Sequence, residues 1–308
     1  MSVTHRSVLT AVDEGRFQQL DGRGVNISLL VHDDGRPLSV KVHCPSRSSQ
    51  VDLHRIRHLD EVLDGFSWYP SLVDAGIVDS RLVVVRPFVP GTPIEDAKLH
   101  IGDVVEVLGA LAGRGGVPAS AETVGDYATA WLLGRQTLPP FSAGHRDLAR
   151  AAGEHLPELM AAARSLTGDT AMAYHGDLHG RNLVAGAAGR FTVIDWDEAG
   201  FSSRPADAGK ALWLSCRRER GDFRLDPEAV RNFLVAIRTR LPRTMTGAVE
   251  VARLGALWFV PTAAHVTLLA RRDASMVPWY LGWVSRFWAR YRENSDIVRA
   301  ADPDRAGG

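Results

Sequence analysis

Cysteine and lysine are scarce in this sequence, and uncharged runs long enough to span a membrane are missing. The low cysteine content and the short uncharged runs each exclude a class of protein. Only Cys44 and Cys216 are present, too few and too far apart for a disulfide framework or a zinc site. Residues 254–270 form an uncharged run of 17, which is shorter than the roughly 20 residues that a membrane span needs. Pro261 and His265 interrupt it, so we expect a buried core helix there.

Net charge is also missing, because 36 basic residues balance 36 acidic ones. Without a global field, the chain is not expected to bind nucleic acid or an anionic membrane. Residues 1–14 lack the apolar core of a signal peptide. We therefore expect a cytoplasmic globular protein, a monomer or a homodimer, whose partner is a small molecule.

Lysine occurs only at Lys41, Lys98 and Lys210, against 33 arginines. A coding bias toward arginine explains the imbalance, and it makes a lysine inside an apolar strand more informative. Lys41 lies in such a strand, in S-V-K-V, where an ammonium without an anionic partner is costly. The alternative is an edge-strand lysine that points to solvent.

Hydrophobic patterning divides the chain into a strand-rich part and a helix-rich part. The first contains predicted strands at 27–32, 37–44, 71–78 and 81–86 and a helix at 50–64. The second contains a turn-rich insert at 171–200 and predicted helices at 101–113, 124–136, 144–166, 205–219, 226–240, 246–271 and 275–292. The Pro/Gly-rich segment 87–93 separates them. We predict an α+β fold with a small antiparallel β lobe over 1–89, a hinge at 86–91 and a larger, mainly α lobe over 90–308.

The residues that indicate chemistry lie in Y-H-G-D-L-H-G-R-N-L-V, starting at Tyr174, and in F-T-V-I-D-W, starting at Phe191. Phosphoryl transfer needs a carboxylate to orient the acceptor hydroxyl and oxygen ligands for Mg²⁺. Asp177 and Asn182 supply a carboxylate and an amide within one loop. A hairpin through the segment that follows would return Asp195 beside them, so the three side chains could converge on one metal–nucleotide site.

These motifs resemble the aminoglycoside phosphotransferase/choline kinase superfamily, whose pattern is H-G-D-x-H-x-x-N followed by a strand ending in I-D-W or I-D-F. The resemblance implies a bilobal protein-kinase-like fold that uses ATP or GTP with Mg²⁺. It implies that Asp177 is the catalytic base, that Asn182 and Asp195 are catalytic residues that hold Mg²⁺, and that His175 braces the loop.

The sequence departs from the family pattern at two places. Gly180 and Arg181 stand where the family usually has Pro-Gly, and Ser203-Arg204 stands where it has Asp-Pro. The acidic residue that ends the second motif is kept as Asp207, which by the resemblance would steady the catalytic loop. Neither departure removes a catalytic group.

By the same resemblance, Lys41 would reach the α- and β-phosphates of the nucleotide. Asp52 stands where the family has the glutamate that pairs with this lysine, and Glu61 is a second possibility. Gly22 and Gly24 would let backbone N–H groups approach the phosphates, although a plain β-turn has the same composition.

The predicted hinge, which starts at Arg86, would receive the adenine through backbone hydrogen bonds. Pro87 has no N–H group to donate, so Phe88 is the expected donor.

The leading hypothesis is an ATP- and Mg²⁺-dependent kinase of a small-molecule hydroxyl group. Residues 208–308 hold seventeen basic and ten acidic residues, a formal charge of +7. This charge favours a neutral or anionic acceptor, such as a natural product, nucleoside, sugar or amino alcohol. The alternatives are an inactive nucleotide-binding module and an aminoglycoside resistance kinase. A protein kinase is disfavoured because no long segment ending in A-P-E follows Asp195.

Overall fold

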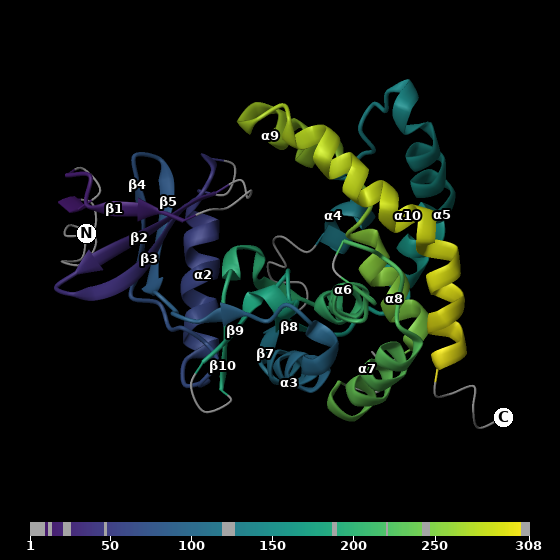
Figure 1. The fold of residues 1–308 in the computed structure, drawn as a ribbon, viewed down its shortest axis with the longest axis horizontal. Coiled ribbons are helices and arrows are strands. Elements are labelled where there is room, and N and C mark those ends of the chain that lie inside the picture. The colour runs from purple at the N-terminus through teal and green to yellow at the C-terminus, as the bar shows by residue number, and fades with distance from the viewer. Residues whose placement is uncertain are drawn as a thin grey trace. The chain divides into compact units, whose positions relative to one another are not determined.

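A computed structural model describes residues 10–11, 14–20, 26–45, 48–118, 127–186, 190–219, 221–241 and 247–302. The chain divides into two compact units (Figure 1). The first comprises Met1–Pro93 and Leu183–Ile194, and the second comprises Ile94–Asn182 and Asp195–Gly308. The first is built mainly from strands and the second mainly from helices, as the α+β prediction requires.

The first unit is organised around an antiparallel sheet with the strand order β1-β2-β3-β5-β4. Its strands are β1 (Phe17–Gln19), β2 (Ile27–Asp33), β3 (Arg36–Val42), β4 (Asp74–Val78) and β5 (Arg81–Pro87). One sheet face buries a cluster that includes Val31 and Val40. Helix α2 (Gln50–Leu63) covers the other face, where its residues Leu53 and Ile56 pack against Val84.

A second, small sheet also belongs to the first unit. It has the order β10-β9-β6, formed by β6 (Thr92–Pro93), β9 (Leu183–Ala185) and β10 (Phe191–Val193). β9 and β10 form the hairpin that the sequence predicted. The predicted boundary at residue 89 gave this hairpin to the second lobe. The structure places it in the first unit, because β9 pairs with β6 and the Val193 N–H donates to the Trp68 carbonyl at 2.8 Å.

The second unit contains a sheet of order β11-β8-β7 surrounded by helices. Its strands are β7 (Gly115–Pro118), β8 (Thr170–Tyr174) and β11 (Gly200–Ser202). Its α-helices are α3 (Ile101–Ala112), α4 (Tyr127–Leu132), α5 (Arg146–Ser165), α6 (Ala206–Ser215), α7 (Pro227–Arg240), α8 (Ala248–Leu257), α9 (Ala263–Arg272) and α10 (Met276–Ala301).

Two helix predictions differ most from the structure in extent. The helix expected over 246–271 is two helices, α8 and α9, because Pro261 cannot continue a helix and Thr262 caps the next one by accepting a hydrogen bond from the His265 N–H. The last helix, expected to end at residue 292, continues to Ala301. None of the helices within the described ranges is long and apolar enough to cross a membrane.

Candidate active site

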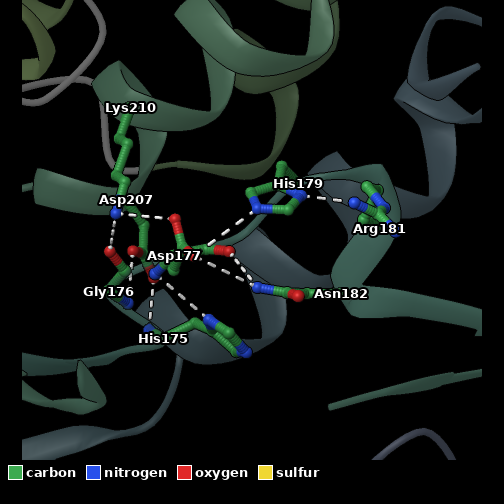
Figure 2. Close-up of polar contacts among 8 residues, drawn as sticks. All are labelled: His175, Gly176, Asp177, His179, Arg181, Asn182, Asp207 and Lys210. Atoms are coloured by element: carbon green, nitrogen blue, oxygen red, sulfur yellow. Dashed lines mark hydrogen bonds and ion pairs between the residues drawn. The ribbon is translucent and has the colours of Figure 1, made fainter. Parts of the chain in front are cut away.

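The loop between β8 and β9 carries the predicted catalytic aspartate and asparagine in direct contact. The Asn182 Nδ2 donates to the Asp177 backbone carbonyl at 2.8 Å and lies 3.4 Å from Asp177 Oδ2 (Figure 2). Because the amide nitrogen faces Asp177, the Oδ1 of Asn182 points away from that carboxylate. A short 3₁₀ turn, η4 (Gly180–Asn182), supplies the curvature that brings the two residues together.

Two buried side chains hold the backbone of this loop. Asp207, in the first turn of α6, accepts hydrogen bonds from the N–H groups of His175 and Gly176, the latter at 2.7 Å. The fully buried His175 ring accepts the Asp177 N–H on Nδ1 at 3.2 Å and lies 4.5 Å from the Trp196 ring. These contacts fix the loop from its backbone and leave the Asp177 side chain, 29% exposed, to face outward.

Gly176 is required at its position by both conformation and space. Its φ is +86°, in the left-handed region that favours glycine. A Cβ there would lie 2.7 Å from the Glu198 carbonyl oxygen, which follows from the close approach of η6 (Trp196–Glu198). The residue before Asp177 is therefore constrained to be glycine by packing as well as by the loop's turn.

Sequence reasoning missed one functional residue, Lys210 of α6. Its Nζ lies 2.7 Å from Asp177 Oδ1, donates to the Gly176 carbonyl at 2.5 Å and sits 3.4 Å from the centre of the Trp258 ring. The side chain is 1% exposed. The signal in the sequence that could identify Lys210 is its position three residues after Asp207 in a mainly apolar helix.

The pKa values of the two carboxylates of the site, Asp177 and Asp207, are shifted in opposite directions. Burial alone would raise the pKa of Asp177, but the Lys210 ammonium and His179 outweigh it and hold that pKa well below 3.8. Burial raises the pKa of Asp207, and the opposing hydrogen bonds and His175 do not reverse the shift. Asp177 is therefore an ionised carboxylate at neutral pH, an acceptor of hydrogen bonds and a weak base.

Asp195 lies two residues after the end of the hairpin strand β10. The register pairs Leu183 with Val193, which leaves Asn182 and Ile194 at neighbouring positions just outside the hairpin, with Asp195 next. The backbone of Asp195 is left-handed, with φ of 67°, and its exposed side chain does not cap η6. Helix capping, the simplest structural reason for an aspartate at this position, therefore does not account for Asp195.

The donor set of Asn182 and Asp195 fits Mg²⁺. An amide oxygen and a carboxylate are ligands that Mg²⁺ accepts, with substrate phosphates and water completing its octahedral shell. In the part of the chain that the structure describes, no three His, Cys, Asp or Glu side chains are grouped so that they could hold a metal ion.

In the first unit, Lys41 lies on a central strand and not on an edge. Its strand β3 pairs with β2 and β5, and Lys41 stands opposite Val84, so it shares the sheet face that α2 covers. The carboxylate of Asp52 caps the N-terminus of α2, where it forms a capping box with Ser49, and it lies 3.6 Å from the Arg55 guanidinium. Glu61 lies 3.5 Å from His58.

The predicted hinge groups are engaged inside the first unit. The Arg86 guanidinium donates to the Pro70 carbonyl at 2.6 Å and lies 4.9 Å from the centre of the Tyr69 ring. The Phe88 N–H, the expected adenine donor, donates to the Pro37 carbonyl at 3.0 Å and so extends the pairing of β3 with β5. Gly22 and Gly24 lie outside the described residues.

Both departures from the family motif have a structural reason. At Gly180 a Cβ would lie 2.8 Å from Ala97 Cβ and 2.9 Å from the Ile94 carbonyl oxygen, so this loop has no room for a proline ring. Arg204 donates to the Ala163 carbonyl at 2.7 Å and to Thr129 Oγ1 at 2.8 Å. The arginine therefore links the segment before α6 to α5 and α4.

Comparison with known proteins identifies the class. The model of the phosphotransferase enzyme family matches residues 18–237, and the chain belongs to this family. The fold is that of protein-kinase-like phosphotransferases, as the resemblance implied. A search of curated proteins finds no match.

Solved structures show the same fold at low sequence identity. A thermostable mutant of aminoglycoside phosphotransferase APH(4)-Ia, in complex with AMP-PNP and hygromycin B, is 17% identical with a TM-score of 0.54, over 93% of this chain and 94% of that chain. Plasmodium vivax ethanolamine kinase is 10% identical with a TM-score of 0.64, over 95% and 87%. LicA in complex with AMP is 13% identical with a TM-score of 0.61, over 98% and 100%.

Proposed function

We propose that this phosphotransferase moves the γ-phosphoryl group of ATP to a hydroxyl group of a small molecule. The observation that carries the proposal is the partly exposed Asp177 carboxylate, held by its own loop beside Asn182. Nucleotide use is supported by the structural neighbours that hold AMP-PNP, ADP and AMP.

In this mechanism Asp177 accepts a hydrogen bond from the acceptor hydroxyl and aligns its oxygen for attack. A strong base is not needed, because the transition state of phosphoryl transfer is loose and the proton can leave late. Asn182 and Asp195 would hold Mg²⁺, which supplies charge neutralisation on the phosphates. Lys41 is proposed as the basic group of the first unit that binds the nucleotide phosphates.

The acceptor is proposed to be neutral or anionic. Lys210 already compensates the charge of Asp177, so a cationic acceptor gains little from this carboxylate. The surplus of seven positive charges over residues 208–308 acts in the same direction. The second candidate is an aminoglycoside kinase, which is favoured by the likeness to APH(4)-Ia bound to hygromycin B.

The test is an ADP-release screen across neutral, anionic and polycationic hydroxylated compounds, hygromycin B included. The matched control is Asp177→Asn, which keeps the shape of the side chain but removes the negative charge of the carboxylate. We expect turnover with a neutral or anionic compound and only a small residual rate in the variant. Equal ADP release by wild type and Asp177→Asn would mean that the measured activity comes from a contaminant. It would favour the alternative, an inactive nucleotide-binding module.

A further inference from the structure

Lys210 is a buried cation that belongs to neither of the predicted motifs. It lies in α6, 33 positions after Asp177 in the sequence, and is among the largest fully buried side chains of the described chain. An ammonium in such a place is costly unless each of its N–H groups has a partner. The contacts of Lys210 therefore need an explanation beyond packing.

The partners of the Lys210 ammonium match its three N–H donors. Two are oxygens, Asp177 Oδ1 at 2.7 Å and the Gly176 carbonyl at 2.5 Å, and the third is the π-face of Trp258 at 3.4 Å. Figure 2 shows the lysine reaching from α6 to the loop that carries Asp177. With these three contacts, the ammonium has no N–H group left for a substrate.

The two oxygens of Asp177 are consequently unequal. Oδ1 has a short contact with Lys210, whereas the contacts of Oδ2 with the described residues are longer, at 3.4 Å to His179 Nε2 and at 3.4 Å to Asn182 Nδ2. A hydroxyl hydrogen bond of ordinary length is shorter than either of these. Oδ2 is thus the oxygen that a hydroxyl can approach.

Packing of two helices places Lys210 and Trp258 around the loop. A Cβ at Gly209 would lie 2.2 Å from the Val251 carbonyl oxygen, and a Cβ at Gly255 would lie 2.1 Å from the Gly209 carbonyl carbon. α6 and α8 therefore touch backbone to backbone at this glycine pair. Lys210 follows Gly209 in α6, and Trp258 caps the end of α8.

We propose that Lys210 is a positioning residue that clamps Oδ1 of Asp177 and thereby assigns Oδ2 to the acceptor hydroxyl. The proposal rests on the proposed function for its kinetic consequence, but the clamp itself is a property of the folded protein. Lys210 acts through Asp177, so its removal should affect the rate of transfer more than the binding of nucleotide.

The clamp can be tested without an acceptor by ¹⁵N NMR of the lysine ammonium groups. The chain has only three lysines, so the variants Lys210→Met and Lys98→Met assign the resonances directly. We expect a slowly exchanging signal that disappears in Lys210→Met, persists in Lys98→Met and shifts in Asp177→Asn. A Lys210 signal that is unchanged in Asp177→Asn would overturn the clamp, whatever the outcome of the activity screen.

The kinetic test uses the acceptor found in that screen, with ADP titration and thermal unfolding as checks on folding. We expect Lys210→Met to lower kcat by about 100-fold, the typical loss when a reacting group is misplaced by about 1 Å. The KM for ATP should change by less than about threefold, and Lys98→Met should match wild type. In the Asp177→Asn background, Lys210→Met should change the residual rate by less than about twofold, because the group it positions is gone.

A kcat of Lys210→Met within about twofold of wild type, or an equal loss in both backgrounds, would refute the positioning role. The proposed function would stand in either case, because wild-type turnover is its own test. Where the wild type turns over no acceptor, the proposed function fails, and the NMR experiment alone decides the clamp.

Discussion

The glycine pair between α6 and α8 leads to a prediction that runs against helix propensity. Replacing a helical glycine with alanine ordinarily stabilises a protein by about 0.5–1 kcal/mol. At Gly209 the added Cβ would lie 2.2 Å from the Val251 carbonyl oxygen and 2.5 Å from the Gly255 nitrogen. Both atoms are backbone atoms of a neighbouring helix, so no side-chain rotation can relieve the overlap.

The clash should therefore exceed the gain in propensity. Overpacking a core by one methyl group costs about 1–3 kcal/mol and more where backbone must move. We expect Gly209→Ala to lower the free energy of unfolding by about 2 kcal/mol, after the gain of up to about 1 kcal/mol from propensity. For a chain of 308 residues that loss corresponds to a decrease in Tm of roughly 3 °C.

Gly153 provides the matched control. It lies within α5, it is exposed, and a Cβ there would have no atom within 4 Å. Gly153→Ala should therefore raise the free energy of unfolding by up to about 1 kcal/mol. Urea denaturation of both variants and calorimetric Tm values measure the contrast. If Gly209→Ala proved as stable as Gly153→Ala, the close contact of α6 with α8 would be refuted, together with the placement of Lys210.

Three further perturbations test the loop and the lysine of the first unit. Asp207→Ala should cost about 2–5 kcal/mol in urea denaturation, because the buried N–H groups of His175 and Gly176 lose their acceptor; a loss below about 1 kcal/mol would contradict this. The pKa of Asp177 is lower in the folded protein than the usual value of 3.8, so its ionised form stabilises the fold above pH 3.8. This stabilisation is lost as the pH falls through the pKa of the folded state. The Tm difference between wild type and Asp177→Asn should therefore be constant above about pH 5 and shrink below pH 4. A Tm difference that grows as the pH falls would contradict the lowered pKa of Asp177. Lys41→Arg should weaken ADP binding about tenfold in a titration, since a planar guanidinium does not replace a compact ammonium; unchanged affinity would place Lys41 outside the phosphate site.

Local patterns in the sequence were sufficient for the loop and for the fold class. His175, Asp177 and Asn182 lie within eight residues, so the contacts of Asp177 with the other two residues are local in the chain. The hairpin that leads to Asp195 was predictable for the same reason, because its two strands are adjacent in the chain. The alternation of β2 and β3 and the spacing in α2 likewise report which face each element buries.

Only the tertiary structure decided the surroundings of that loop. The clamp on Asp177 depends on Lys210, and their contact exists because Gly209 and Gly255 let two helices meet at backbone distance. The sequence predicts Phe88 as the adenine donor because Pro87 has no N–H group, whereas in the structure the Phe88 N–H donates to the Pro37 carbonyl because β3 and β5 are neighbours in the sheet. Such contacts join residues far apart in the chain, and their energies depend on burial and on packing that no local pattern records.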